Sequence, residues 1–336
     1  FLLSGAVRYE NYSDFGGTIN FKLATRIKAS ENVNIRGGLQ TGFRAPSLHQ
    51  IHFNSTSTIF VDGIPNEVGI FPNTSRVARI LGIPSLKEET SFGATAGFTA
   101  KIPTANMRVT VDGYLVNIDD RVVLTGQFND NGNPELATLF AQANASQAAF
   151  FANAVDTQTK GLDIVVEHNG NISDNLRIRN MLALTFAETS VENVAVPDAI
   201  AAAGLTDTYF DETSRIYLEA AVPRTKGNLS HNLTLNENWN FFLRNSYFGE
   251  VEEATNNMDP TVDRLYAGKL ITDLSIGHDI DENITLTIGA NNLLDVYPDI
   301  SDPAFQSSGR FLYSRRSVQF GTNGRHLFAR LQFKIK

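Results

Sequence analysis

The chain alternates apolar and polar residues with a period of two over most of its length. In one stretch Ile19, Phe21 and Leu23 share one parity, and Asn20 and Lys22 share the other. Successive side chains of a β-strand point to opposite faces, so the pattern predicts strands with one apolar and one polar face. No apolar run approaches the roughly 18 residues of a transmembrane helix, whereas a transmembrane strand needs only about ten alternating residues.

The alternation predicts twelve strands, most of them longer than the roughly five or six residues of an ordinary strand. Five short connections fall at one end of the strands, and five long ones fall at the opposite end. This favours an all-β, transmembrane, antiparallel up-and-down β-barrel with short periplasmic turns and long extracellular loops. A soluble β-sandwich or propeller would expose its polar faces to water, and the strand lengths argue against both. The predicted strands cover residues 3–12, 18–28, 33–44, 87–102, 107–124, 159–168, 176–188, 226–236, 239–249, 269–280, 284–296 and 325–335.

Two of the long connections contain alanine-rich stretches that favour helices. Residues 134–154 begin with a proline, which is acceptable in the first turn of a helix, and residues 197–203 form the second stretch. Residues 129–135 are only faintly similar to a calcium-binding loop, because they lack its ligand spacing and consist of ordinary turn formers.

Composition excludes several classes of function. The chain has 336 residues, no cysteine and a formal net charge of −8. The absence of cysteine excludes disulfides and cysteine-ligated zinc, and the negative charge argues against a nucleic-acid partner. No nucleophile, zinc-protease, phosphate-loop or dinucleotide motif is present, so we expect no enzymatic activity and no resident cofactor.

One motif is specific enough to indicate a family. Residues 42–48 read Gly-Phe-Arg-Ala-Pro-Ser-Leu. They resemble the Phe-Arg-Ala-Pro box of TonB-dependent outer-membrane receptors, which follows a barrel strand and opens an extracellular loop. A second box of that family, usually Asn-Pro-Asn-Leu-Lys-Pro-Glu, is replaced here by residues 83–89. Neither asparagine is present, but the segment keeps Pro84, Leu86, Lys87 and Glu89.

Further segments match that family in the expected order. Residues 112–122, 159–163, 289–297 and 324–325 resemble boxes near its later strands, although Lys336 stands where such barrels usually end in an aromatic residue. The resemblance implies a barrel of twenty-two strands around a globular plug. We therefore expect residues 1–336 to form the C-terminal portion of the barrel, about its last twelve strands, with the plug and the first strands lying upstream. Such an open sheet would be stable only together with the missing part.

The resemblance also implies a function. Members of the family import a scarce nutrient, such as a siderophore, haem, cobalamin or an oligosaccharide, across the outer membrane of Gram-negative bacteria. The implied partners are the TonB complex, reached through the plug, outer-membrane lipids and a small-molecule ligand, with no nucleic acid. Two alternatives stay open from the residues alone: a passive porin, and a secreted β-rich binding or adhesion protein.

Candidate ligand-binding residues lie just beyond the first box. In haem-uptake members a histidine between the two boxes can ligate haem iron, and His49 and His52 occupy that interval, so haem is one possible cargo. Arg44 has the parity of the polar face, where pairing with a carboxylate of the lumen or plug is favoured over contact with the ligand. Phe53 is one of several loop aromatics that could line a ligand vestibule, although packing of the loops together is favoured. The others are Phe60, Phe71, Phe150, Phe151, Tyr209 and Phe210.

Other aromatic and histidine residues are expected at the membrane interfaces. Phe43, Tyr114, Phe248 and Tyr297 lie near the ends of predicted strands and are expected in the interfacial girdles. His168 and His231 fall on apolar faces, and we expect them at a rim and not as ligands.

Overall fold

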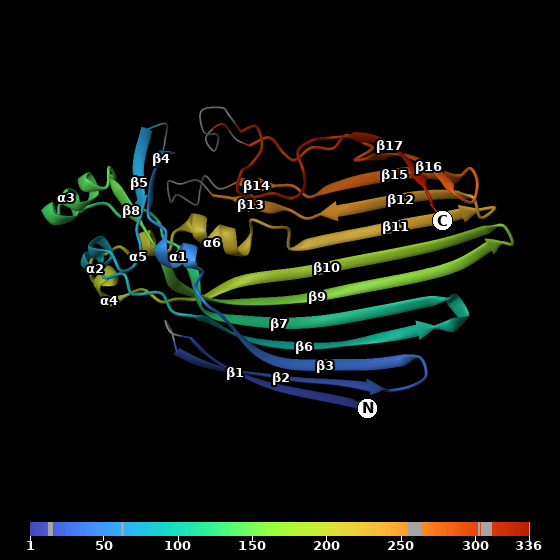
Figure 1. The fold of residues 1–336 in the computed structure, drawn as a ribbon, viewed down its shortest axis with the longest axis horizontal. Helices are drawn as coiled ribbons and strands as arrows, with labels where there is room; N and C mark the ends of the chain where they lie inside the picture. Colours follow the sequence, from blue (N-terminus) through green and yellow to red (C-terminus); the bar gives the residue numbers. More distant parts are fainter. Residues whose placement is uncertain (13–15, 62–63, 255–263, 302, 304–310, 336) are drawn as a thin grey trace.

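One large antiparallel sheet dominates the computed structural model, which describes residues 1–12, 16–61, 64–254, 264–301, 303 and 311–335. Twelve strands pair in chain order, and Figure 1 shows them running side by side. The predicted strand number and antiparallel topology are therefore confirmed. The strands are β1 (Leu2–Tyr12), β2 (Gly16–Lys28), β3 (Val33–Arg44), β6 (Glu89–Ile102), β7 (Met107–Leu124), β9 (Phe151–Ser173), β10 (Leu176–Val194), β11 (Thr225–Leu235), β12 (Trp239–Phe248), β15 (Lys269–Asp279), β16 (Ile284–Asn291) and β17 (His326–Phe333).

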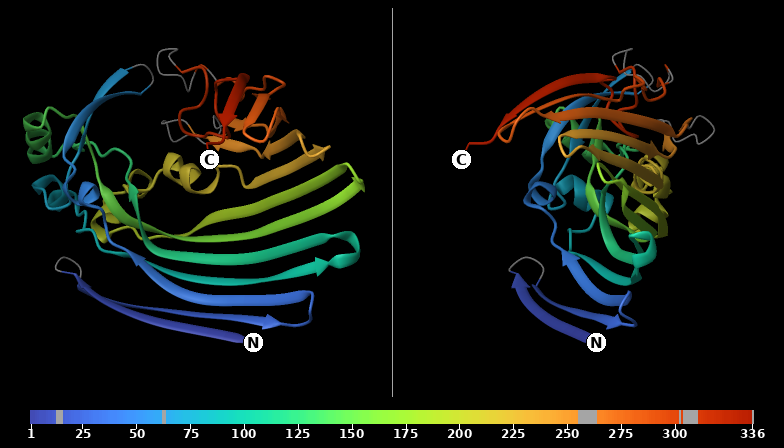
Figure 2. Two further views of the ribbon diagram at one scale, coloured as in Figure 1. Left: turned by 45° about the vertical axis from the view of Figure 1, so that its right-hand side comes forward. Right: turned by 90° about the vertical axis from the view of Figure 1, so that its right-hand side faces the viewer.

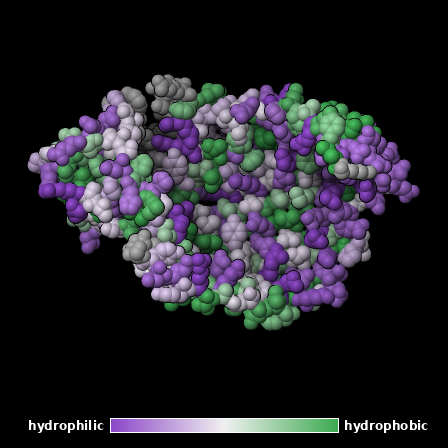
Figure 3. All heavy atoms as spheres, in the orientation of Figure 1, coloured by the Kyte–Doolittle hydropathy of each residue, from purple (hydrophilic) through white to green (hydrophobic). Residues whose placement is uncertain are grey.

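The sheet is curved and open. Figure 2 shows the strands arranged in an arc, and β1 and β17 form its two edges. The apolar parity of each strand faces outward and is exposed: Ile19, for example, has 71% of its surface accessible. The side chains of polar parity lie on the concave side. Figure 3 is a view of this side, and it shows hydrophilic residues around a hollowed centre. This is the reverse of a water-soluble domain, in which large apolar side chains are mostly buried.

Smaller elements fill the long connections at one end of the sheet. Both alanine-rich stretches carry a helix, as predicted: α3 (Pro134–Gln142) covers only the first nine residues of 134–154, and α4 (Asp198–Ala202) lies within 197–203. The other elements were not predicted, because each is too short to show a clear period. They are α1 (Leu48–His52), β4 (Ser55–Val61), β5 (Ile64–Ile70), α2 (Arg76–Leu81), η1 (Pro103–Ala105), β8 (Gln147–Ala149), α5 (Thr206–Tyr209), α6 (Glu212–Glu219), β13 (Val251–Glu253) and β14 (Arg264–Tyr266).

Several strand boundaries differ from the prediction. β9 starts at Phe151, earlier than predicted, and β10 extends to Val194 as its partner. The start of β9 shows no alternation in sequence, because Ala152, Ala154 and Val155 are all fully buried against the loops. β16 ends at Asn291, before the predicted end, because Asn292 adopts a positive φ of 50° and turns the chain away.

The apolar core lies in the loops and not inside the sheet. Phe71 packs against Phe140 and Phe150, with ring centroids 6.3 Å apart in both pairs, and Phe128 lies 6.0 Å from Phe150. Tyr209 and Phe210 are also buried in this cluster. Most of the loop aromatics therefore pack together, as favoured above, whereas Phe53 is exposed. The side chain of Phe60 lies outside the described residues.

Among the described residues, no helix is long and apolar enough to cross a membrane.

Candidate functional site

The two sequence boxes meet at the elaborated rim of the sheet. Arg44 ends β3 and Glu89 begins β6, and the register places them directly opposite each other. The Arg44 guanidinium donates from Nε to Glu89 Oε2 at 2.6 Å, and the backbone N–H of Val122 on β7 donates to Glu89 Oε1 at 2.6 Å. The Glu89 side chain is only 7% exposed. The pair of Arg44 and Glu89, called the rim clamp below, closes the base of the loop 45–88.

Two asparagines from distant segments hold the second box. Asn153 on β9 accepts from the N–H of Lys87 at 2.9 Å and donates to the Lys87 carbonyl at 3.0 Å. Asn73 donates to the Pro84 carbonyl at 2.6 Å. The box lacks both family asparagines, yet its backbone is still bound by asparagine side chains. Sequence reasoning missed Asn73 and Asn153, and the only signal was that Asn153 interrupts an apolar run.

The predicted ligand-binding histidines lie on α1, directly after the rim clamp. Ser47 caps this helix by accepting from the N–H of Gln50 at 3.2 Å, and the Gln50 side chain accepts from the N–H of Ser47 at 2.9 Å. His49 and His52 are both exposed. Phe53 follows as the C-cap, and its N–H donates to the His49 carbonyl at 2.9 Å. The structure thus places these three side chains on one exposed helical turn, within the loop that the rim clamp closes.

A metal site assembled from side chains does not occur in the part of the chain that the structure describes. No group of three or more His, Asp or Glu residues there could hold a metal ion. Two histidines on α1 could still act as ligands to an incoming group that carries its own metal, since neutral imidazole is a common iron ligand.

A second set of hydrogen bonds closes the last loop at the same rim. It is centred on Asn292 and is called the lock at Asn292 below. The N–H of Asn292 donates to Asp273 Oδ1 at 2.8 Å, and Asp273 Oδ2 accepts from Nε of Arg244 at 2.8 Å. The Asn292 side chain also accepts from the N–H of Val296 at 2.9 Å. Further along, Asp295 accepts from the N–H of Arg325 at 2.8 Å, which joins the two ends of the loop. These contacts join the two motif segments 289–297 and 324–325 to each other and to the sheet.

Tyr114 was predicted in an interfacial girdle, and that prediction is wrong. Its side chain lies on the concave face, where it covers Gly161 of β9. It shares this face with Asp112, which binds Arg36 of β3 through Nε at 2.7 Å. The polar face of the sheet is therefore cross-braced by side chains that reach over β6, an arrangement that suits the inner wall of a barrel.

His168 and His231 lie on the outward face and are tied to Asn180. The Asn180 side chain contacts Nδ1 of His168 at 2.9 Å and Nδ1 of His231 at 2.7 Å, and both histidines are directly opposite it in the register. The three residues form a hydrogen-bonded row across β9, β10 and β11, close to the short turns. Each histidine is thus hydrogen-bonded to Asn180, and the expectation that neither is a ligand stays a prediction.

An apolar outward face, a polar concave face and one elaborated rim together define the wall of a transmembrane β-barrel. The family described as "TonB dependent receptor-like, beta-barrel" matches residues 1–293. The chain belongs to that family.

Solved structures show the same fold at low sequence identity. A mutant of the ferric enterobactin receptor PfeA from Pseudomonas aeruginosa, in complex with enterobactin, has a TM-score of 0.66 at 14% identity, covering 98% of this chain and 43% of that one. The ferripyoverdine receptor of the outer membrane of Pseudomonas aeruginosa has a TM-score of 0.57 at 9% identity, and the match covers 98% of this chain and 36% of that one. The copper transporter OprC has a TM-score of 0.56 at 13% identity, and the match covers 94% of this chain and 39% of that one. The chain thus spans less than half the length of these proteins. No curated protein matches it.

Proposed function

We propose that this chain is the C-terminal part of a receptor in the outer membrane of a Gram-negative bacterium, one that imports a scarce nutrient by TonB-dependent transport. It would supply about the last twelve of twenty-two strands, with a plug and the first strands contributed by the rest of the receptor. The observation that carries this proposal is the family match over residues 1–293. The open edges of β1 and β17 support it, because unpaired backbone groups in lipid cost several kcal/mol each.

Transport of this kind makes and breaks no covalent bond, so the proposed receptor is not an enzyme. The ligand binds the outer loops and the outer surface of the plug. Energy delivered by the TonB complex to the plug then opens a path through the lumen. The rim clamp and the lock at Asn292 keep two long loops anchored at the rim while the ligand binds, and the buried aromatic cluster gives the loops a core of their own.

The cargo is proposed only as a class: a siderophore, haem, cobalamin or an oligosaccharide. His49, His52 and Phe53 are the proposed ligand contacts, because they are exposed on α1 within the anchored loop. Haem is one possible cargo for the two histidines. Arg44 was a further candidate, but its guanidinium is bound to Glu89, which supports a role in anchoring the loop.

The secreted binding protein and the passive porin, the two alternative functions, each predict a different feature of the protein. A secreted binding protein would need its large apolar side chains covered, but those of the outward face are exposed from β1 to β17. A passive porin would have the same wall and no plug, and its transport would be independent of energy.

Growth of a deletion strain on defined sources of iron, haem, cobalamin and glycans tests the proposed function. Loss of growth on one source, restored by the full receptor only in cells with a working TonB complex, is the expected result. Growth restored equally in cells that lack TonB would contradict the proposal and favour the porin.

A further inference from the structure

The outward face of the sheet carries a row of three polar residues within an apolar surrounding. They are His168 of β9, Asn180 of β10 and His231 of β11, and we call them the polar row. All three side chains are half-buried. The outward positions two residues away on these strands hold only glycine or aliphatic residues: Val166, Gly170, Ile178, Leu182, Leu229 and Leu233. Polar and ionisable side chains within membrane segments are costly, so their presence indicates a function.

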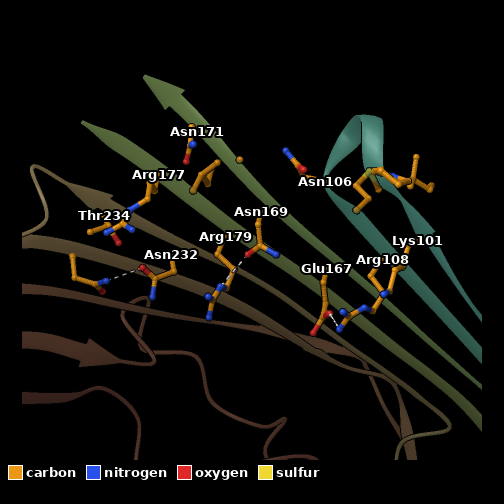
Figure 4. A pocket seen from close by; sticks show the side chains of 16 residues that line it. Lys101, Asn106, Arg108, Glu167, Asn169, Asn171, Arg177, Arg179, Asn232 and Thr234 are labelled. Atoms are coloured by element: carbon orange, nitrogen blue, oxygen red, sulfur yellow. Dashed lines mark hydrogen bonds and ion pairs between the residues drawn. The ribbon is translucent and has the colours of Figure 1, made fainter. Parts of the chain in front are cut away.

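The opposite face of the same strands shows that the polar row points away from the lumen. Figure 4 shows Glu167, Asn169 and Arg179, which line a cavity of about 840 Å³ on the concave face. Successive side chains of a strand alternate between its two faces, so His168 and Asn180 point to the other side of the sheet. The polar row therefore faces lipid.

The polar row lies near the end of the strands that has the short turns. His168 is directly opposite Met107, the first residue of β7, which follows the turn between β6 and β7. On the same outward face and at the same end, the ring of Trp239 stacks on that of His278, with centroids 4.1 Å apart. Tryptophan is enriched at membrane–water interfaces. The polar row is thus within reach of lipid headgroups in the periplasmic leaflet.

The hydrogen bonds of Asn180 give the two histidines opposite roles. The Asn180 amide nitrogen only donates, and it lies 2.9 Å from Nδ1 of His168, so that Nδ1 accepts. The Asn180 amide oxygen only accepts, and it lies 2.7 Å from Nδ1 of His231, so that Nδ1 donates. A neutral imidazole has one N–H, so His168 presents an Nε2–H donor and His231 presents a bare Nε2 acceptor. Turning the amide over exchanges the two roles and keeps one donor and one acceptor.

Both Nε2 atoms are open to a partner from the membrane. In the part of the chain that the structure describes, neither of them has a hydrogen-bond partner. Gly170 keeps the space beside the His168 ring free, because a Cβ there would lie 3.0 Å from Cε1 and 3.3 Å from Nε2. Gly170 is two residues closer to the short turns than His168. The Nε2 atom of His168 is therefore on the side of its ring that faces the headgroups.

We infer that the polar row binds the headgroup of a phospholipid that carries a phosphate and an N–H-bearing ammonium group, as phosphatidylethanolamine does. The phosphate accepts from Nε2–H of His168, and the ammonium group donates to the bare Nε2 of His231. The acyl chains lie along the apolar outward side chains beyond the row, such as Leu182 and Leu229. The inference rests on the barrel fold in a membrane and not on the proposed cargo.

Native mass spectrometry of the full receptor tests this inference, because it counts the lipids that stay bound after release from detergent. The purified receptor is titrated with phosphatidylethanolamine or with phosphatidylcholine of the same acyl chains, whose headgroup has no N–H. We expect one phosphatidylethanolamine to bind roughly tenfold more tightly than phosphatidylcholine, as one additional hydrogen bond to a charged group would give. His168→Leu/His231→Leu should remove this difference. His278→Leu should not, because His278 lies on the same outward face at the same end but outside the polar row.

A second variant keeps the polar row and closes the space beside it. Gly170→Ala places a methyl group against the His168 ring, so it should weaken the binding of phosphatidylethanolamine and leave that of phosphatidylcholine unchanged. Gly113→Ala is its matched control on the outward face of β7, because a Cβ at residue 113 would meet nothing closer than 3.8 Å.

Equal affinities of the unaltered receptor for the two lipids, or equal losses in the control variants, would overturn the inference. Displacement of the lipid by soluble glycerophosphoethanolamine at the same concentration would also overturn it, since the site would then recognise a soluble compound. A receptor that imports its nutrient but shows no preference between the two lipids would sink this inference alone. A receptor that prefers phosphatidylethanolamine but imports nothing would sink only the proposed function.

Discussion

Glu89 accepts a hydrogen bond from the guanidinium of Arg44 across the mouth of the loop 45–88, with Nε and Oε2 2.6 Å apart. The same carboxylate accepts from the N–H of Val122. One buried side chain therefore joins β3, β6 and β7 at the elaborated rim. Removing it leaves a backbone donor without a partner in a buried position, and such a loss costs roughly 1–3 kcal/mol.

We therefore expect Glu89→Ala to destabilise the full receptor by about that amount, measured by urea titration in lipid vesicles. Glu89→Gln is the control, because its amide oxygen can still accept from Val122, whereas the charge and the hydrogen bond from Arg44 Nε are lost. It should cost less than the alanine variant. Equal losses for the two variants would show that the ion pair, and not the bond to Val122, stabilises the rim.

Gly161 is required because Tyr114 lies directly over it. A Cβ at residue 161 would clash with the Tyr114 ring and come within 2.8 Å of the Phe186 carbonyl oxygen. Gly161→Ala should thus destabilise the receptor by about 1–3 kcal/mol through overpacking, seen as a lower urea midpoint. Gly113→Ala is a matched control on β7, since its Cβ would meet nothing closer than 3.8 Å. A similar midpoint for the two variants would refute the steric explanation.

Tyr209 is fully buried in the loop cluster, and its hydroxyl has no hydrogen-bond partner among the described residues. A buried hydroxyl without a partner destabilises the folded state, so Tyr209→Phe should be neutral or stabilise the loops by up to roughly 1–2 kcal/mol. Limited proteolysis of the outer loops measures this. Faster cleavage of the variant would reveal a partner for the hydroxyl.

The pH dependence of the same residue follows from its burial, which raises the pKa of Tyr209 to about 12. An unfolded tyrosine titrates near pH 10. Because the folded pKa is the higher, the stability that Tyr209 contributes is fully present below about pH 10 and is lost as the pH rises through about 12. Tyrosinate absorbance should show one late-titrating group that is missing in Tyr209→Phe. An identical titration of the two proteins would contradict this.

His49 and His52 are exposed on α1, and their replacement should not disturb the fold. The variant His49→Ala/His52→Ala should keep the stability of the receptor within about 0.5 kcal/mol, because exposed side chains away from special features contribute little. If the cargo is bound through imidazole, the affinity of the receptor for it should fall at least tenfold, measured on whole cells. Ser57→Ala on β4 is an exposed control in the same loop. Unchanged binding would remove both histidines from the site.

The period-two alternation was enough to predict the strands, because a strand places neighbouring side chains on opposite faces whatever its partners are. The alternating short and long connections predicted their antiparallel order. The two helices with alanine-rich sequences were predictable for the same local reason, since helix propensity belongs to the residues themselves. The early part of β9 was not predictable, because its consecutive residues 152–155 are all buried, which removes the alternation between the two faces.

The sequence by itself determined the outward apolar face, the polar inner face and the family motifs of this protein. Only the tertiary structure decided that Glu89 binds Val122 as well as Arg44, that Asn153 holds Lys87, and that Tyr114 covers Gly161. Local pattern specifies faces, whereas contacts between distant residues depend on how the strands align.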